Sequence, residues 1–69
     1  MNVNIARLRG KMVEKGFTVD TLATAIGINR ATLYRKFDAI EKFTIGEALK
    51  IKAVLQLTDE EACLIFLTK

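Results

Sequence analysis

Apolar residues recur along this chain at intervals of three and four positions, which is the period of an amphipathic helix. No stretch alternates polar and apolar residues over the length of a strand, and the chain contains no proline, the residue that most strongly interrupts a helix. The first helical face is formed by Ile5, Leu8, Met12 and Val13. The pattern therefore predicts an all-α fold.

Residues suited to helix ends divide the first half of the chain. Gly16 and Gly27 follow apolar segments and can adopt the left-handed backbone that ends a helix. The side chains of Thr18 and Asn29 can accept a hydrogen bond from the first turn of the helices that follow them. We therefore expect three helices, from about Asn4 to Lys15, from the residue after Thr18 to about Ile26, and from about Arg30 to Phe37.

The second half of the chain contains the pattern Thr-x-x-Glu twice, at Thr44 with Glu47 and at Thr58 with Glu61. In this capping box, each side chain accepts a hydrogen bond from the backbone N–H of the other residue. Two further helices are expected to start there, which makes a compact five-helix bundle. A chain of 69 residues can bury one hydrophobic core, so residues 1–69 are interpreted as a single domain.

The core of this bundle follows from the inward positions of the expected helices. It is predicted to contain Ile5, Leu8, Leu22, Ala23, Ile26, Leu33, Phe37, Leu49 and Leu55. Segment 38–43 has neither glycine nor proline, and we expect Ile40 and Phe43 to hold it against this core.

An apolar run from Ala62 to Leu67 covers every side of the last predicted helix, and one core cannot bury all sides of a helix. One interpretation is that this helix is inserted deeply into a small core. We favour a dimer contact, because an exposed apolar patch on so small a domain otherwise promotes aggregation. Cys63 is expected to pack there as a small hydrophobic residue. The predicted dimer interface is Leu64, Ile65, Phe66 and Leu67.

The charge is distributed unevenly along the chain. Residues 1–37 contain seven Lys and Arg and two Asp and Glu, a balance of +5, whereas residues 38–69 contain four and six, a balance of −2. One part of the molecule is therefore expected to attract polyanions. The alternative is an ordinary solvated surface, because basic patches are common and become specific only when they coincide with a binding motif.

Side chains that carry common catalytic chemistry are scarce. The chain has no histidine and one cysteine, so it forms no internal disulfide and lacks the commonest metal ligand and general base. We find no nucleophile paired with a base and no glycine-rich phosphate loop, and we expect neither an enzyme nor a metal or other cofactor. The longest apolar run has six residues, against about 18 to 20 for a membrane span, and no secretory signal is visible. A cytoplasmic protein without a membrane partner is expected.

Two of the predicted short helices are separated by Gly27, Ile28 and Asn29, which is the arrangement of a helix-turn-helix. Ala23 is small where two such helices cross closely, and Leu33 with Phe37 lies on the inward face of the second helix. The string TVDTLATAIGINRATLYRKF, followed by FTIGEALKIKAVLQLTDEEACLIFL, resembles the Cro and repressor-type helix-turn-helix regulators. The resemblance is strongest to small regulators from phages and prophages of Gram-positive bacteria, and it covers about residues 3–67.

This resemblance implies that the second helix of the motif enters the major groove of DNA. The residues that would face base edges are Asn29, Arg30, Ala31, Thr32, Tyr34 and Arg35. Arginine can donate two hydrogen bonds to guanine O6 and N7, asparagine can pair with adenine or a phosphate, and Ala31 or Thr32 can contact a thymine methyl group. A phosphate contact or a solvated side chain is the alternative for each arginine, although we expect at least one to read a base.

Phosphate contacts in this family lie at the start of the motif's first helix and after its second helix. The residues that fill these places here are Thr18, Lys36, Lys42 and Thr44. Val19 departs from the family pattern, because this position is often a glutamine that reaches the DNA backbone. Valine cannot donate a hydrogen bond, so we expect a weaker contact at this edge.

The expected function is that of a DNA-binding transcriptional regulator in a phage or prophage genetic switch, located in the bacterial cytoplasm or nucleoid. Its partner would be double-stranded operator DNA, bound by a homodimer that forms at least on DNA. The alternative is a protein-interaction module that binds and modulates another phage repressor and has little DNA affinity of its own. Val19 and the apolar last helix leave this alternative open.

Overall fold

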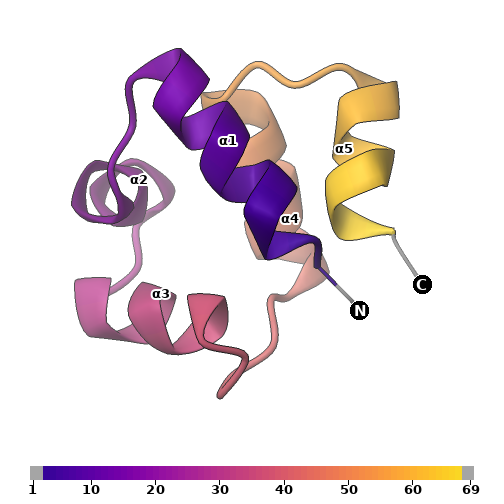
Figure 1. Cartoon of the computed structure of the whole chain (residues 1–69). Coiled ribbons are helices and arrows are strands. Elements are labelled where there is room, and N and C mark those ends of the chain that lie inside the picture. Colours follow the sequence, from indigo (N-terminus) through magenta and orange to yellow (C-terminus); the bar gives the residue numbers. More distant parts are fainter. Residues whose placement is uncertain (1–2, 68–69) are drawn as a thin grey trace.

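The computed structural model describes residues 3–67, and these residues form five helices and no strand (Figure 1). The helices are α1 (Ile5–Lys15), α2 (Val19–Ile26), α3 (Arg30–Phe37), α4 (Ile45–Val54) and α5 (Asp59–Phe66). The predictions of an all-α fold, of five helices and of their starting points are therefore confirmed.

The first turn of each helix is closed by a side-chain cap, and the caps of the last four helices are the predicted ones. Asn4 Oδ1 accepts from the Arg7 N–H at 3.1 Å, and the Thr44–Glu47 and Thr58–Glu61 capping boxes are formed in both directions. Such a cap contributes about 1 kcal/mol to the stability of a helix. The remaining caps are Thr18, which forms a reciprocal box with Thr21, and Asn29.

Two glycines end α1 and α2 in the left-handed conformation that the sequence predicts. Gly16 has a φ of 79° and Gly27 a φ of 78°. After Gly27 the Ile28 N–H donates to the Ala23 carbonyl at 3.0 Å, and the Ile28 side chain packs against the core. The chain therefore turns sharply between α2 and α3 and holds the two helices in a fixed relation.

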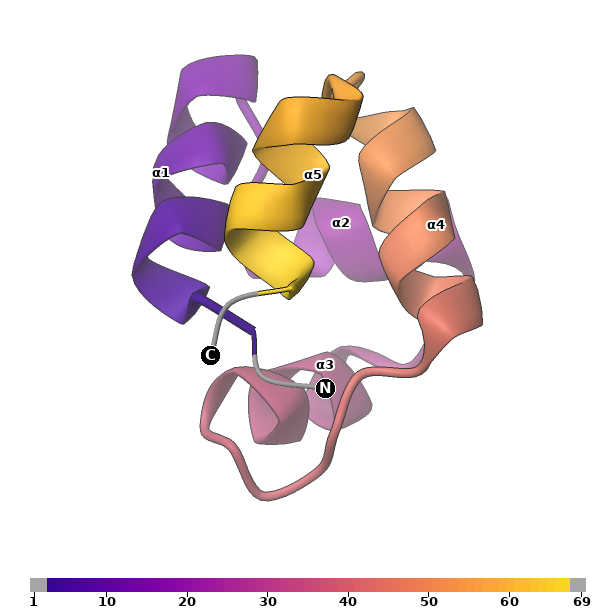
Figure 2. The ribbon, with the colours of Figure 1, turned by 90° about the vertical axis from the view of Figure 1, so that its right-hand side faces the viewer.

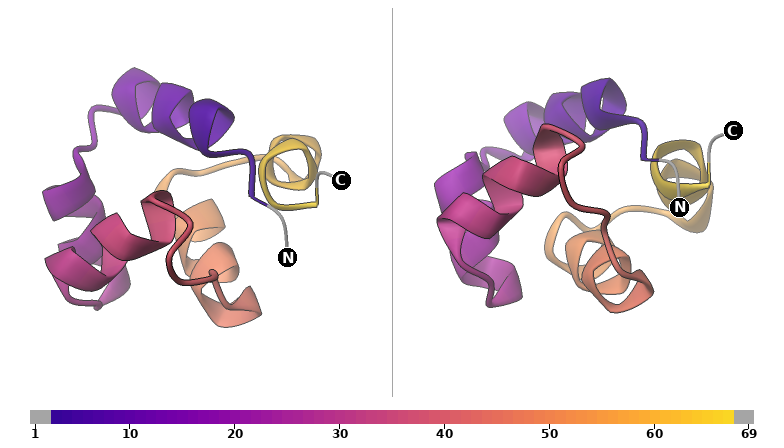
Figure 3. Two further views of the ribbon diagram at one scale, coloured as in Figure 1. Left: turned by 60° about the horizontal axis from the view of Figure 1, so that its bottom comes forward. Right: turned by 90° about the horizontal axis from the view of Figure 1, so that it is seen from below.

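The helices form two packed groups around one core. α2 packs against both α3 and α4, while α1 packs against α5. Seen from the side, α5 lies between α1 and α4, and α3 lies below them (Figure 2). Seen from below, α3 crosses the molecule on the side nearest the viewer (Figure 3). The centre of the core is formed by Leu8, Leu22, Leu33, Ile51, Leu55 and Ile65.

Three predicted inward positions are wrong. Leu49 is 62% exposed because α4 turns Ala48, Ile51 and Leu55 toward the core, which places Leu49 on another face. Val13 is exposed, since Met12 beside it occupies the inward position of the last turn of α1. Ile40 is exposed too: the loop after α3 reverses at Ala39, whose φ is 61°, and Phe43 is the residue that holds this loop to the core. Ile5, also predicted to be in the core, is partly buried against it.

The last helix, α5, is inserted into the core along one side. This burial removes two of the four residues that were predicted to form the dimer interface. Ile65 and Phe66 are only 2% and 4% exposed, so the prediction that they form a dimer surface is wrong. The Ile65 carbonyl accepts from the Asn4 N–H at 2.7 Å, and the Phe66 ring lies 6.3 Å from that of Phe43. Cys63, predicted to be packed, is exposed. The exposed large apolar residues here are Leu64 in α5 and Leu67 directly after it.

Candidate nucleic-acid interface

The outer face of α3 collects the residues predicted to contact bases. Leu33 and Phe37 anchor the helix, being buried on the side that faces α2 and the rest of the core. The Phe37 ring also lies 4.9 Å from the Arg9 guanidinium of α1. On the outer side, Thr32 is half-buried and the exposed residues are Arg30, Ala31, Tyr34 and Arg35. These side chains therefore lie on the accessible part of α3.

Arg30 lies at the first turn of α3 and contacts the neighbouring helix. Its Nη1 is 3.3 Å from Oδ2 of Asp20 in α2, and both side chains are more than half exposed. An exposed ion pair of this kind contributes at most about 1 kcal/mol. The guanidinium of Arg30 can therefore leave Asp20 for a stronger partner at little cost.

Arg35, one turn further on, has two partners. Its Nε donates to Glu41 Oε1 at 3.2 Å, and its Nη2 donates to Thr32 Oγ1 at 3.2 Å. Its Nη1 has no hydrogen-bond partner among residues 3–67. Two contacts at different atoms restrict the plane of the guanidinium, and the terminal nitrogens keep N–H groups for a ligand.

Asn29 is the N-cap of α3, and this role limits what it offers to DNA. Its Oδ1 accepts from the Ala31 N–H at 2.8 Å. A bidentate contact with adenine needs both the oxygen and the nitrogen of an asparagine amide. The cap directs Oδ1 toward the first turn of α3 and leaves Nδ2 to donate, which favours the phosphate contact of the two predicted alternatives.

The predicted phosphate contacts Thr18 and Thr44 both lie at helix N-termini. Their hydroxyls already accept from the Thr21 and Glu47 N–H groups, at 3.1 Å in each case. The backbone N–H groups of the two residues after each cap point out of the helix and suit an anion. Val19, where the family often has glutamine, is buried, so this position serves packing and the donors at the start of α2 are backbone groups.

Lys36, predicted to contact a phosphate, is buried instead. Its side chain is 7% exposed, and its Nζ lies 2.8 Å from the Lys42 carbonyl and 3.0 Å from Glu47 Oε1. The ammonium also lies 5.9 Å from the centre of the Phe43 ring. The prediction is wrong because Lys36 follows Leu33 by three positions and precedes Phe37, which places it on the inward face of α3. Of the two predicted lysines, Lys42 is exposed.

Glu47, which is partly buried, is the ion partner of Lys36, and the sequence interpretation assigned it only to a helix cap. Burial raises the pKa of its carboxyl group, but hydrogen bonds from the Thr44 N–H and the Lys36 ammonium outweigh burial and leave the pKa below its ordinary value. This charged pair ties the last turn of α3 to the first turn of α4. The spacing of Leu33, Lys36 and Phe37 matches the helical period, and this is the sequence signal that could have indicated that Lys36 faces inward.

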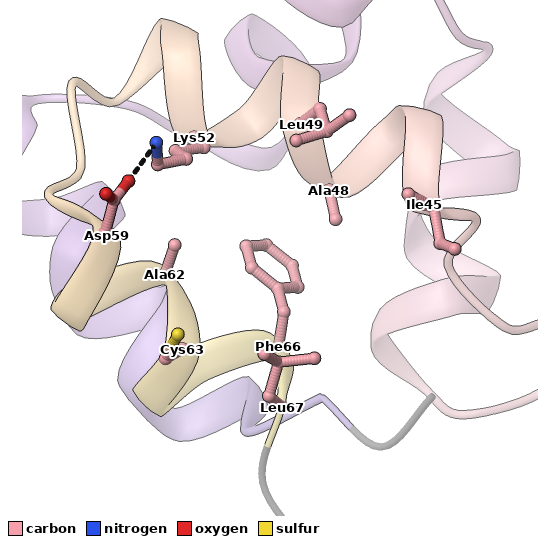
Figure 4. A pocket seen from close by; sticks show the side chains of 9 residues that line it. All are labelled: Ile45, Ala48, Leu49, Lys52, Asp59, Ala62, Cys63, Phe66 and Leu67. Atoms are coloured by element: carbon pink, nitrogen blue, oxygen red, sulfur yellow. Dashed lines mark ion pairs between the residues drawn. The ribbon is translucent and has the colours of Figure 1, made fainter.

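A second surface feature is an apolar groove between α4 and α5 with a volume of about 390 Å³ (Figure 4). Its lining residues are Ile45, Ala48, Leu49, Lys52, Asp59, Ala62, Cys63, Phe66 and Leu67. The Lys52 ammonium lies 2.6 Å from the Asp59 carboxylate at one end and holds the pKa of Asp59 below its ordinary value. Of the four residues predicted to form the dimer interface, Phe66 and Leu67 line this groove, and the α4 side of the groove was not predicted.

Comparison with protein-family models, curated proteins and solved structures finds no match for this chain. The assignment of the site therefore rests on the residues described above. Among residues 3–67, no helix combines the length and the apolar character needed to cross a membrane.

Proposed function

We propose that this protein binds double-stranded DNA in a sequence-specific manner and regulates transcription, with α3 in the major groove. The observation that carries the proposal is the two-sided character of α3, which is anchored through Leu33 and Phe37 and presents two arginines on its outer side. The major groove of B-DNA is wide enough for one α-helix. A short helix fixed at the edge of a small domain is a suitable element to enter it.

Each outer residue has a defined role in this proposal. Arg30 and Arg35 donate to guanine or to phosphates, and Ala31 or Thr32 contacts a thymine methyl group. Asn29 donates to a phosphate through Nδ2, and Tyr34 contacts either a base or the backbone. Phosphates at the two edges of the groove are bound by Lys42 and by the backbone N–H groups that follow Thr18 and Thr44.

The charge distribution supports a nucleic-acid partner. Residues 1–37, which contain α1, α2 and α3, carry a balance of +5. Binding to phosphates releases condensed counterions, so the affinity for DNA should fall as the salt concentration rises. The resemblance to small Cro and repressor-type regulators extends the proposal to an operator of a phage or prophage switch, where bound protein blocks or modulates RNA polymerase.

A homodimer on DNA forms part of this proposal. Ile45 and Leu49 of α4 and Leu67, directly after α5, expose apolar surface within the groove. This side of the molecule adjoins the edge where α3 lies (Figure 2). Two copies related by a two-fold axis at the groove would present both α3 helices to one face of a duplex. Their spacing should be about 34 Å, one turn of DNA.

Selection of bound duplexes from a random DNA pool tests the proposal directly. The selected site should then be bound more tightly than unrelated DNA, with a negative dependence on salt concentration. Arg35→Ala should weaken binding to the selected site by about 1 to 3 kcal/mol. Lys15→Ala is the matched control, because it removes one positive charge from the end of α1, on the opposite side of the molecule from α3 (Figure 1). Failure to enrich any sequence would contradict sequence-specific binding.

The second candidate function is a protein-interaction module that binds and modulates another repressor. The apolar groove favours it, as do Asp20 and Glu41, which place carboxylates next to both arginines of α3. Binding to a repressor in the absence of DNA, together with no salt-dependent DNA affinity, would support this function over the first.

A further inference from the structure

We propose that Glu41, in the loop between α3 and α4, determines the base preference of Arg35. This inference rests on the proposed DNA-binding function and adds the residue that orients the base-reading side chain. Arg35 is held at Nε by Glu41 and at Nη2 by Thr32, both at 3.2 Å. The two contacts lie on different nitrogens, so they fix the plane of the guanidinium before DNA is present.

The backbone around Glu41 is itself fixed to α3. The Ile40 and Glu41 N–H groups both donate to the Arg35 carbonyl, at 2.9 and 3.3 Å. Glu41 therefore contacts Arg35 through its backbone and its side chain, which closes a ring between the two residues. On the other side, the carbonyl of Lys42 accepts from the buried Lys36 ammonium at 2.8 Å. The loop is thus anchored on both sides of the carboxylate that orients Arg35.

This arrangement selects the edge of Arg35 that meets DNA. Because Nε is occupied, the terminal nitrogens Nη1 and Nη2 are the donors left for a base, and Nη2 has a second N–H beyond the one given to Thr32. Guanine offers two adjacent acceptors, O6 and N7, that match such a pair of donors. The Glu41 carboxylate also repels phosphates, which disfavours movement of Arg35 toward the DNA backbone. Arg35 should therefore read guanine.

Arg30 provides an internal comparison. It has one carboxylate contact, at 3.3 Å to Asp20, and its side chain is more exposed than that of Arg35. Its guanidinium plane is consequently less restricted, and we assign Arg30 to phosphate contact. The difference between the two arginines lies in the residues that hold them, since their side-chain chemistry is identical.

The test measures the affinity of the full chain for the duplex selected by the unmodified protein and for the duplexes that replace the preferred guanine with each other base. Glu41→Ala should reduce the preference for guanine on the order of tenfold, because a bidentate arginine contact discriminates by about that factor or more. It should also strengthen binding to unrelated DNA, because a repulsive charge is removed. Glu41→Gln, which keeps an oxygen acceptor for Nε, should retain part of the preference. Glu60→Ala, an exposed charge removed from α5, should leave the preference unchanged.

A double-substitution cycle separates positioning from a general charge effect. In the background of Arg35→Ala, removal of the Glu41 side chain should cause no further loss of base preference. If Glu41→Ala strengthens binding to all duplexes equally and leaves the preference for guanine intact, the positioning role is wrong. If the unmodified protein shows no base preference, the proposed sequence-specific function is wrong. This failure is distinguishable from failure of the Glu41 proposal, because it is seen in the unmodified protein alone.

Discussion

The Nζ of Lys36 lies 3.0 Å from a carboxylate oxygen of Glu47, and this ion pair between a buried lysine and a partly buried glutamate joins the end of α3 to the start of α4. It spans the loop that contains Glu41 and Lys42, so it fixes the position of two residues assigned here to DNA recognition. A buried charge is stable only when it is paired, because removal from water disfavours an isolated ion. The pair therefore links the stability of the domain to the geometry of its candidate binding surface.

Replacement of Lys36 by methionine, which retains the apolar stem over Phe43, should leave the partly buried Glu47 without its ion partner. The expected loss is about 2 to 4 kcal/mol of unfolding free energy, since breaking a buried pair from one side is strongly unfavourable. Urea denaturation followed by circular dichroism measures it. Lys50→Met, an exposed position on α4, is the control. Equal denaturation midpoints for the two variants would contradict the structural role of Lys36.

The ion pair between Lys11 of α1 and Glu61 of α5 should make stability depend on pH in the acid range. The Lys11 ammonium, with the Thr58 N–H, lowers the pKa of Glu61 from 4.5 to about 2. Since the folded-state pKa is the lower one, the contribution is fully present above about pH 4.5. It is lost as the pH falls toward 2. Thermal unfolding between pH 2 and 6 should show a weaker pH dependence for Glu61→Gln than for Glu60→Gln.

Lys42 should contribute to DNA affinity without contributing to sequence preference. Its side chain is exposed and it follows the residue that orients Arg35. Lys42→Ala should weaken binding to all duplexes alike and reduce the slope of log affinity against log salt by about one phosphate contact. Titrations at several salt concentrations measure the slope. A change confined to one base position would assign Lys42 to base readout instead.

The groove between α4 and α5 should supply the contact between two copies on DNA. Leu49→Asp and Leu67→Asp alter side chains that are 62% and 68% exposed, so the fold should persist. They should abolish cooperative occupation of an operator with two half-sites and spare the weaker binding to one half-site. Val13→Asp is the control, because Val13 is an exposed apolar residue of α1 outside the groove. Cooperative binding by both groove variants would place the dimer contact elsewhere.

Helix ends and the exposure of Arg30, Ala31, Tyr34 and Arg35 on α3 were predictable because they depend on local rules. A cap such as Thr44 with Glu47 acts within one turn, and a glycine such as Gly27 ends a helix wherever it stands in the fold. The inward face of α4 was not predictable, because Ile45, Leu49 and Ile51 give it apolar residues on several sides. Whether Ile51 or Leu49 faces the core depends on how α2 and α5 are placed against this helix.

Whether a charged or apolar residue is buried also depends on partners that are distant in sequence. Lys36 is buried because Glu47, in another helix, supplies its counter-charge. Ile65 and Phe66 contact residues distant in sequence: Asn4, before α1, donates to the Ile65 carbonyl, and Phe43, before α4, lies against the Phe66 ring. A run of apolar residues with no polar side cannot reveal which of its members face inward. The exposed groove was consequently recognised on α5 and missed on α4.

The hydrogen bond from the Asn4 N–H to the Ile65 carbonyl brings the beginning of α1 and the end of α5 together at 2.7 Å. A circular permutant, in which a short flexible linker joins the residues before α1 to those after α5, should therefore retain this fold. New ends opened near Gln56, in the turn between α4 and α5, would leave the segment from α2 to α4 uninterrupted. Such a chain should keep both the buried Lys36 pair and the outer face of α3, because packing between helices, and not the order of their connection, holds them in place.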